Sequence, residues 1–114
     1  MKRGFRLRRP IDIKRVRRNG RSTAHPFLVL RSLANEGQGV RVAVMAGRIV
    51  GGAVRRNRAK RLLRAAVQPF LTQMRQDHDL LLMARPGIRE ANSTQVRQAL
   101  DGLLAKARLL KPEE

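Results

Sequence analysis

One segment of the sequence combines a clear helical period with a high density of positive charge. From residue 53 to residue 70, apolar side chains recur at the spacing i, i+3, i+4, i+7, i+8 and i+11, which predicts a helix with one face packed on a core. That face comprises Ala59, Leu62, Leu63, Ala66, Val67 and Phe70, and the opposite face comprises Arg56, Asn57, Lys60, Arg61 and Arg64. No acidic residue occurs between Glu36 and Asp77, so the charge is uncompensated nearby and indicates a polyanionic partner.

The whole chain is strongly basic. It has 26 Lys and Arg against 8 Asp and Glu, for a formal charge of +18 on 114 residues. A charge of this size indicates nucleic acid as partner, with an anionic membrane as a weaker possibility. An ordinary solvated face is the alternative for the basic helix, but such faces usually mix both signs.

Composition favours one small domain over residues 1–114, with a basic N-terminal arm at residues 1–9. The hydrophobic share of 42% suffices for a core. Absence of cysteine excludes disulfides and thiolate metal sites and fits a reducing compartment, so we expect a cytoplasmic protein. We recognise no secretory signal and no membrane-spanning apolar run.

Turn residues and hydrophobic patterns divide the chain into further elements. We expect a short helix at residues 11–18, strands at 27–33 and 40–46, a possible short third strand at 48–50, the basic helix ending near Pro69, a central strand at 79–85, and a last helix capped by Asn92 or Ser93. The spacing of the strands at 27–33 and 40–46 suits a hairpin. The resulting order is α-β-β-(β)-α-β-α, a sheet with helices packed on it.

Catalytic groups are scarce. The one cluster is Asp77-His78-Asp79, and a strand would send His78 and Asp79 to opposite faces, so a polar turn leading into a strand is favoured over a metal site. A Gly-rich phosphate loop is absent, and Gly51-Gly52 fits a turn and helix start better. We therefore predict no catalytic residues and no metal ligands in this chain.

The sheet does not resemble an aromatic RNA-binding platform, because the chain has three Phe and no Tyr or Trp. Arg31 stands out, since alternation places it on one face with Phe27, Val29 and Leu33. The interpretations stay open: an edge position or a stem that reaches water on one side, and a contact that lines a groove on the other.

Residues 51–64, Gly-Gly-Ala-Val-Arg-Arg-Asn-Arg-Ala-Lys-Arg-Leu-Leu-Arg, closely resemble the Arg-Asn-Arg signature helix of the bacterial ribonuclease P protein component. The resemblance covers nearly the whole chain. It includes the helix ending at Asn19-Gly20, the Phe-Leu-Val-Leu strand, Arg41-Val-Ala-Val44 and the strand at 79–85.

This resemblance implies the small protein subunit of an RNA-based endonuclease. In that family the catalytic RNA and its Mg²⁺ remove the 5′ leader of precursor tRNA, and the protein holds no cofactor. Its partners would be the catalytic RNA and precursor tRNA, with a monomer in a 1:1 ribonucleoprotein and no membrane. The implied fold is an α/β sandwich of αβββαβα order, with a four-stranded sheet and a left-handed βαβ crossover.

The resemblance also assigns residues by position. The expected RNA-binding set is Arg48, Arg55, Arg56, Asn57, Arg58, Lys60, Arg61 and Arg64. The expected leader cleft contains Ile13, Arg17 and Arg31, where the family usually has aromatic side chains. The segment before the helix departs too, since Gly47-Arg48-Ile49 replaces the common Ser-Lys-Lys and Gly51-Gly52 replaces Gly-Asn.

The main alternative is a small ribosomal or RNA-chaperone protein that binds structured RNA without an enzymatic role. It explains the charge equally well but does not explain the Arg-Asn-Arg helix in this order of elements. A cationic membrane-active helix is the third interpretation, and the scarcity of aromatic residues disfavours it.

Overall fold

The computed structural model describes residues 3–75 and 77–111. The main elements are α1 (Pro10–Asn19), β1 (Arg21–His25), β2 (Leu28–Ala34), β3 (Arg41–Met45), α2 (Ala53–Val67), β4 (His78–Ala84) and α3 (Ser93–Lys106). Short 3-10 helices lie at η1 (Arg3–Phe5), η2 (Arg48–Val50), η3 (Gln68–Phe70) and η4 (Pro86–Glu90). The predicted αβββαβα order is confirmed.

The four strands form one mixed sheet in the order β1-β2-β4-β3. β1 pairs with β2 and β2 with β4 in antiparallel fashion, whereas β3 and β4 are parallel. The chain therefore crosses from β3 to β4 through α2. The four-stranded sheet is confirmed, and the left-handed sense of this crossover stays a prediction.

Two details of the predicted sheet are wrong. β2 and β3 do not form a hairpin, because β4 lies between them. The expected short strand at residues 48–50 is a 3-10 helix, and the remaining strand is β1, which the sequence analysis missed. Three of the five residues of β1 are exposed, none is fully buried, and the strand carries no apolar alternation, so period-two patterning gave no signal for it. The central place of β4 is confirmed and follows from its apolar residues on both faces.

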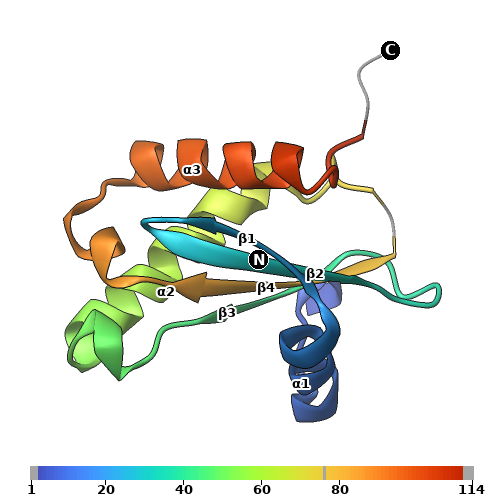
Figure 1. The fold of residues 1–114 in the computed structure, drawn as a ribbon, viewed down its shortest axis with the longest axis horizontal. Coiled ribbons are helices and arrows are strands. Elements are labelled where there is room, and N and C mark those ends of the chain that lie inside the picture. The colour runs from blue at the N-terminus through green and yellow to red at the C-terminus, as the bar shows by residue number, and fades with distance from the viewer. Residues whose placement is uncertain (1–2, 76, 112–114) are drawn as a thin grey trace.

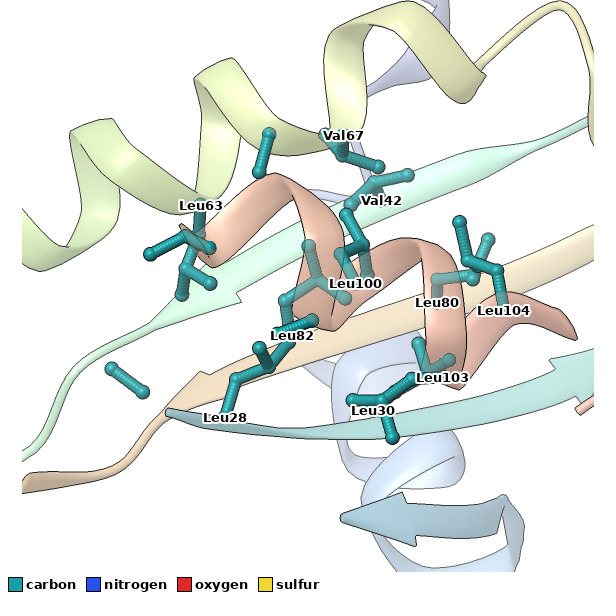
Figure 2. Close-up of a cluster of buried hydrophobic side chains, with 14 of the residues drawn as sticks. Leu28, Leu30, Val42, Leu63, Val67, Leu80, Leu82, Leu100, Leu103 and Leu104 are labelled. Carbon is teal, nitrogen blue, oxygen red and sulfur yellow. The ribbon is translucent and has the colours of Figure 1, made fainter. Parts of the chain in front are cut away.

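The helices cover the two faces of the sheet unequally (Figure 1). α2 and α3 pack together on one face, over the larger core, and α1 lies on the other. Figure 2 shows Leu80 and Leu82 of β4 directed toward Leu63 of α2 and Leu100 and Leu104 of α3. The neighbouring Leu81 points the other way and packs in a small cluster with Leu7, Val16 and Ala43. One short helix cannot cover a whole sheet face, so part of the face beside α1 stays accessible.

The helix ends follow the expected local chemistry. Pro10 occupies the first turn of α1, and α2 gives way to a 3-10 turn that contains Pro69. Of the two candidates for the cap of α3, Asn92 is the cap: its side chain accepts a hydrogen bond from the backbone N–H of Gln95, whose side chain accepts one from the N–H of Asn92.

The N-terminal arm lies along the outer edge of β3. Arg6 forms a parallel bridge with Val42, and the Leu7 N–H donates to the Val42 carbonyl at 2.9 Å. The Leu7 side chain is 4% exposed, so it anchors the arm in the small core. The basic composition of the arm did not predict this anchoring.

Candidate nucleic-acid interface

α2 divides its side chains between the core and the surface as its sequence period predicted. Ala59, Leu63, Ala66 and Val67 are buried, and Leu62 packs partly buried against the same core. On the other side, Arg55, Asn57, Arg61 and Arg64 are exposed, Arg56 and Lys60 are half-buried, and Arg48 is exposed in η2. These seven side chains form no hydrogen bond or ion pair within the part of the chain that the structure describes. Their charge is available to an external polyanion.

The start of α2 adds to this positive field. Gly52 occupies the N-cap position, no side chain caps the helix, and the first turn holds no acidic residue. Free N–H groups at a helix start attract anions. Gly51 makes the preceding turn possible, since its φ is 139° and an added Cβ would lie 2.7 Å from the Arg55 Cδ. The sequence interpretation of Gly51-Gly52 as turn and helix start is confirmed.

Arg58 differs from the other basic residues of α2. Its Nη2 donates to the Ala91 carbonyl at 2.7 Å, and its Nη1 lies 3.4 Å from the Ile88 carbonyl and 3.3 Å from the Arg89 carbonyl. The guanidinium thus joins α2 to η4 and to the residue before the Asn92 cap. Sequence reasoning placed Arg58 with the RNA-binding set, but its hydrogen bonds point inward and stabilise the fold.

The expected cleft residues Ile13, Arg17 and Arg31 lie on the α1 side of the sheet, where a hydrogen bond joins the two arginines. Arg31 Nη1 donates to the Arg17 carbonyl at 2.7 Å, which joins β2 to the end of α1. Ile13 is partly buried against the small cluster beneath α1. Because β2 is flanked by β1 and β4, the interpretation of Arg31 as an edge residue is wrong. Arg31 is half-buried between α1 and the sheet, at a position that can line a groove.

An apolar strip continues this surface across three strands. Val29 of β2 pairs in register with Met83 of β4, which pairs with Met45 of β3. All three side chains are half-buried, and Met45 and Met83 pack against the same small cluster as Ile13. The sequence analysis did not assign these residues to the cleft, because their neighbourhood depends on the order of the strands.

A charged network holds α1 and β3 at the opposite end of the same face. Asp79 is buried and accepts two hydrogen bonds from Arg41, each 2.8 Å long, and one from Asn35, also 2.8 Å. Asp12 of α1 lies 3.6 Å from Arg41 and 3.0 Å from Arg15. The hydrogen bonds to Asp79 raise the pKa of Arg41 above its ordinary value, although partial burial opposes them.

The Asp77-His78-Asp79 segment has the structural role that its pattern favoured. Asp77 has a φ of 63° and accepts a hydrogen bond from the Gly39 N–H, so it shapes the turn before β4. Among the residues that the structure describes, no group of three or more His, Cys, Asp or Glu side chains could hold a metal ion. A search of the same residues finds no helix long and apolar enough to cross a membrane.

A mixed sheet with an arginine-rich helix on one face and a partly open, arginine-lined strip on the other defines a small α/β nucleic-acid-binding protein. The family described as Ribonuclease P matches residues 1–108 of this chain. The chain therefore belongs to the ribonuclease P protein family.

Individual relatives agree with this assignment. The ribonuclease P protein component of Herpetosiphon aurantiacus is 39% identical over 114 residues, which cover 100% of this chain and 93% of the relative. That of Shouchella clausii is 36% identical, over 98% of this chain and 93% of the relative.

Solved structures share the fold. The RNase P protein of Staphylococcus aureus has a TM-score of 0.81 at 22% identity, over 94% of this chain and 98% of that one. The RNase P protein of Thermotoga maritima has a TM-score of 0.78 at 24% identity, over 89% and 96% of the two chains. The predicted α/β fold is confirmed, and the chain is a subunit of ribonuclease P.

Proposed function

We propose that this subunit binds the catalytic RNA of ribonuclease P through α2 and the 5′ leader of precursor tRNA beside α1, so that the leader is removed to give the mature tRNA 5′ end. The observation that carries this proposal is the row of basic side chains on α2 that have no partner among the described residues. We place this activity in the cytoplasm. A ribosomal or RNA-chaperone role is not favoured, since the family match covers nearly the whole chain.

We assign the chemistry to the RNA and its Mg²⁺. Asp12 and Asp79 are committed to Arg41 and Arg15, and Asp77 to the turn before β4. No carboxylate cluster within residues 3–75 and 77–111 fits a Mg²⁺ ion, which prefers several oxygen ligands. The part of the protein is then to bind and to position the two RNAs.

The interface on α2 should act mainly through phosphate contacts. Each phosphate that a basic side chain neutralises contributes roughly 0.7–0.9 to the slope of log affinity against log salt. Lys60→Ala should therefore weaken binding to the catalytic RNA and flatten that slope by about one unit. Arg75→Ala is the control, because it removes an equal charge from an exposed residue outside α2. Equal slopes for both variants and the parent would exclude α2 as the interface.

We place the leader over the strip of Val29, Met83 and Met45, between Ile13 and the two arginines. Apolar side chains can support a base, and a guanidinium can stack on a base or bind a phosphate. This arrangement would replace aromatic stacking, which typically contributes about 1–3 kcal/mol per base. A larger share of the binding energy is then electrostatic than in a cleft with aromatic side chains. Leader affinity should therefore depend more strongly on salt than it would in such a cleft.

The leader groove is tested by the double variant Arg17→Ala, Arg31→Ala. We expect weaker binding of precursor tRNA, with binding of mature tRNA and of the catalytic RNA nearly unchanged. Arg17→Ala alone is informative, since the Arg17 main-chain carbonyl still accepts the hydrogen bond from Arg31. Arg18→Ala serves as the neighbouring exposed control. An equal fall in all three affinities would assign these arginines to the general basic surface.

The assembly itself is tested by reconstitution. Cleavage of a precursor tRNA by the cognate catalytic RNA is measured with and without this chain, at low and high Mg²⁺. We expect the chain to lower the Mg²⁺ concentration that cleavage requires, because its arginines neutralise phosphate charge that Mg²⁺ would otherwise screen. Cleavage by the chain alone, without the RNA, would contradict our assignment of the chemistry.

A further inference from the structure

An open hollow of about 450 Å³ lies at the outer edge of β3 and is lined by residues of the N-terminal arm, β3, α1 and α2. We call it the edge hollow. Its apolar wall includes Leu7, Ile13 and Val44, and its basic rim consists of Arg6, Arg8 and Arg64. α1 and α2 lie on opposite faces of the sheet (Figure 1), and each contributes one residue, Ile13 and Arg64, so the lining of the edge hollow comes from both sides of the β3 edge. This volume lies within the range of small-ligand pockets, about 300–1,000 Å³.

The charge of the edge hollow is of one sign. Its lining contains three arginines and no acidic residue, whereas Asp12 and Glu36 line the hollow beside α1 and Glu90 lines the one beside Arg58. Arg6, Arg8 and Arg64 are exposed and have no hydrogen bond or ion pair within the described part of the chain. An anionic group that enters the hollow meets three free guanidinium groups.

The strand edge adds directional hydrogen-bonding groups. The Val42 carbonyl accepts from the Leu7 N–H, so the main-chain groups of Val42 point outward from the sheet. Main-chain groups alternate sides along a strand, which places the N–H and C=O of Val44 on the same outer edge. The arm pairs with Val42, and Val44, which lies beyond that pairing, lines the edge hollow. They offer one donor and one acceptor next to an apolar wall.

We propose that the edge hollow binds one unpaired nucleotide, with its base against the strand edge at Val44 and its phosphates on the arginine rim. An apolar wall, a main-chain donor and acceptor, and three guanidinium groups match a base, its polar edge and its phosphates in turn. A base inside an RNA helix is excluded, because its edge is already paired and stacked. This proposal rests on the proposed RNA-binding function. The nucleotide belongs either to the catalytic RNA or to the leader of precursor tRNA.

Site-directed cross-linking tests the proposal and identifies the source. The chain has no cysteine, so Arg8→Cys creates a single attachment point for a photoactivated cross-linker. We expect cross-links from position 8, in the reconstituted ribonucleoprotein with precursor tRNA, to one or two adjacent unpaired nucleotides. The RNA that carries them is the source. Arg75→Cys is the matched control, since it removes the same charge from an exposed residue whose N–H bonds to Leu109 near the end of α3.

A third attachment point separates failure of this proposal from failure of the proposed function. Lys60→Cys reports on α2, and its cross-links to the catalytic RNA test the general interface. Suppose that position 60 cross-links to the catalytic RNA, while position 8 gives no cross-links, scattered cross-links or cross-links to paired nucleotides only. That result would overturn the proposal for the edge hollow and leave the proposed function standing. Absence of RNA cross-links from both positions would overturn the proposed function as well.

Affinity gives a second, independent measurement. Arg6→Ala, Arg8→Ala should weaken binding to the source RNA about tenfold, in the range expected for lost contacts to one nucleotide. Arg18→Ala, Arg75→Ala removes the same charge from two exposed residues elsewhere and should change affinity less than twofold. Chemical probing of the RNA should show that the cross-linked nucleotide loses its protection in the Arg6→Ala, Arg8→Ala variant and keeps it in the control variant. Equal losses in both pairs would mean that the arm contributes only general charge.

Discussion

Replacement of Arg41 should strongly destabilise the fold, because it would leave a buried carboxylate without its main partner. The side chain of Asp79 is 1% exposed, and that of Arg41 is 17% exposed. Breaking a buried ion pair by removal of one partner typically costs about 3–5 kcal/mol. Asn35 would still donate to Asp79, and Arg41 is partly solvated, so we take the lower end, about 3 kcal/mol for Arg41→Met.

This cost is large for a chain of 114 residues. It would lower the thermal midpoint by roughly 10–15 °C. Urea unfolding at moderate salt measures the free energy directly, since salt screens the repulsion among the excess positive charges. Arg15→Met is the control: Arg15 lies 3.9 Å from the same carboxylate but is 50% exposed, and an exposed pair contributes about 0–1 kcal/mol.

A double variant tests the physical cause. Arg41→Met, Asp79→Leu removes both charges, and an apolar pair of similar volume is often neutral relative to a buried ion pair. The double variant should therefore be more stable than Arg41→Met alone. Two results would refute the reasoning. One is a loss of unfolding free energy below 1 kcal/mol in Arg41→Met, and the other is a double variant that is no more stable than Arg41→Met.

Three further variants or conditions test other parts of the structure. Arg58→Ala should lower stability by about 1–3 kcal/mol in urea unfolding, because the Arg89 and Ala91 carbonyls lose their side-chain donor and the Ile88 carbonyl keeps only the bond from the Ala91 N–H. Arg56→Ala should instead change RNA affinity and leave stability nearly unchanged, and the reverse pattern would return Arg58 to the RNA interface. Gly87→Ala should cost about 1–3 kcal/mol, since the new Cβ would lie 2.6 Å from the Pro26 carbonyl oxygen, and a neutral result in thermal unfolding would show that this loop yields easily. Millimolar sulfate should raise the thermal midpoint more than chloride of equal ionic strength, because sulfate bound to the folded chain adds about 1.4 kcal/mol to the free energy of unfolding at ten times the sulfate Kd. Equal effects of the two anions would indicate screening alone.

Local patterns in the sequence predicted much of this protein. The period of residues 53–70 placed Ala59 and Leu63 inward and Arg61 and Arg64 outward, and the two-sided apolar pattern of β4 placed it inside the sheet. The Arg-Asn-Arg signature within this order of elements indicated the family. These features depend on residues a few positions apart, so periodicity alone is sufficient to reveal them.

The neighbourhood of distant segments needed the tertiary structure. Insertion of β4 between β2 and β3 excluded the hairpin and brought Val29, Met83 and Met45 into one strip. β1 was missed because an exposed polar edge strand is stabilised by pairing with β2 and has no apolar pattern of its own.

The sequence shows how many basic side chains the chain has. Only the fold decides which of them stabilise the structure and which are available to bind RNA. Arg58 donates to carbonyls about thirty residues away, Arg41 neutralises a buried carboxylate, and Arg31 joins β2 to α1, while Arg64 remains free at the edge hollow. A sequence shows that a guanidinium is present, but its contribution to binding depends on whether its donors are already used. That is decided by which carbonyls and carboxylates the packed chain brings within hydrogen-bonding distance.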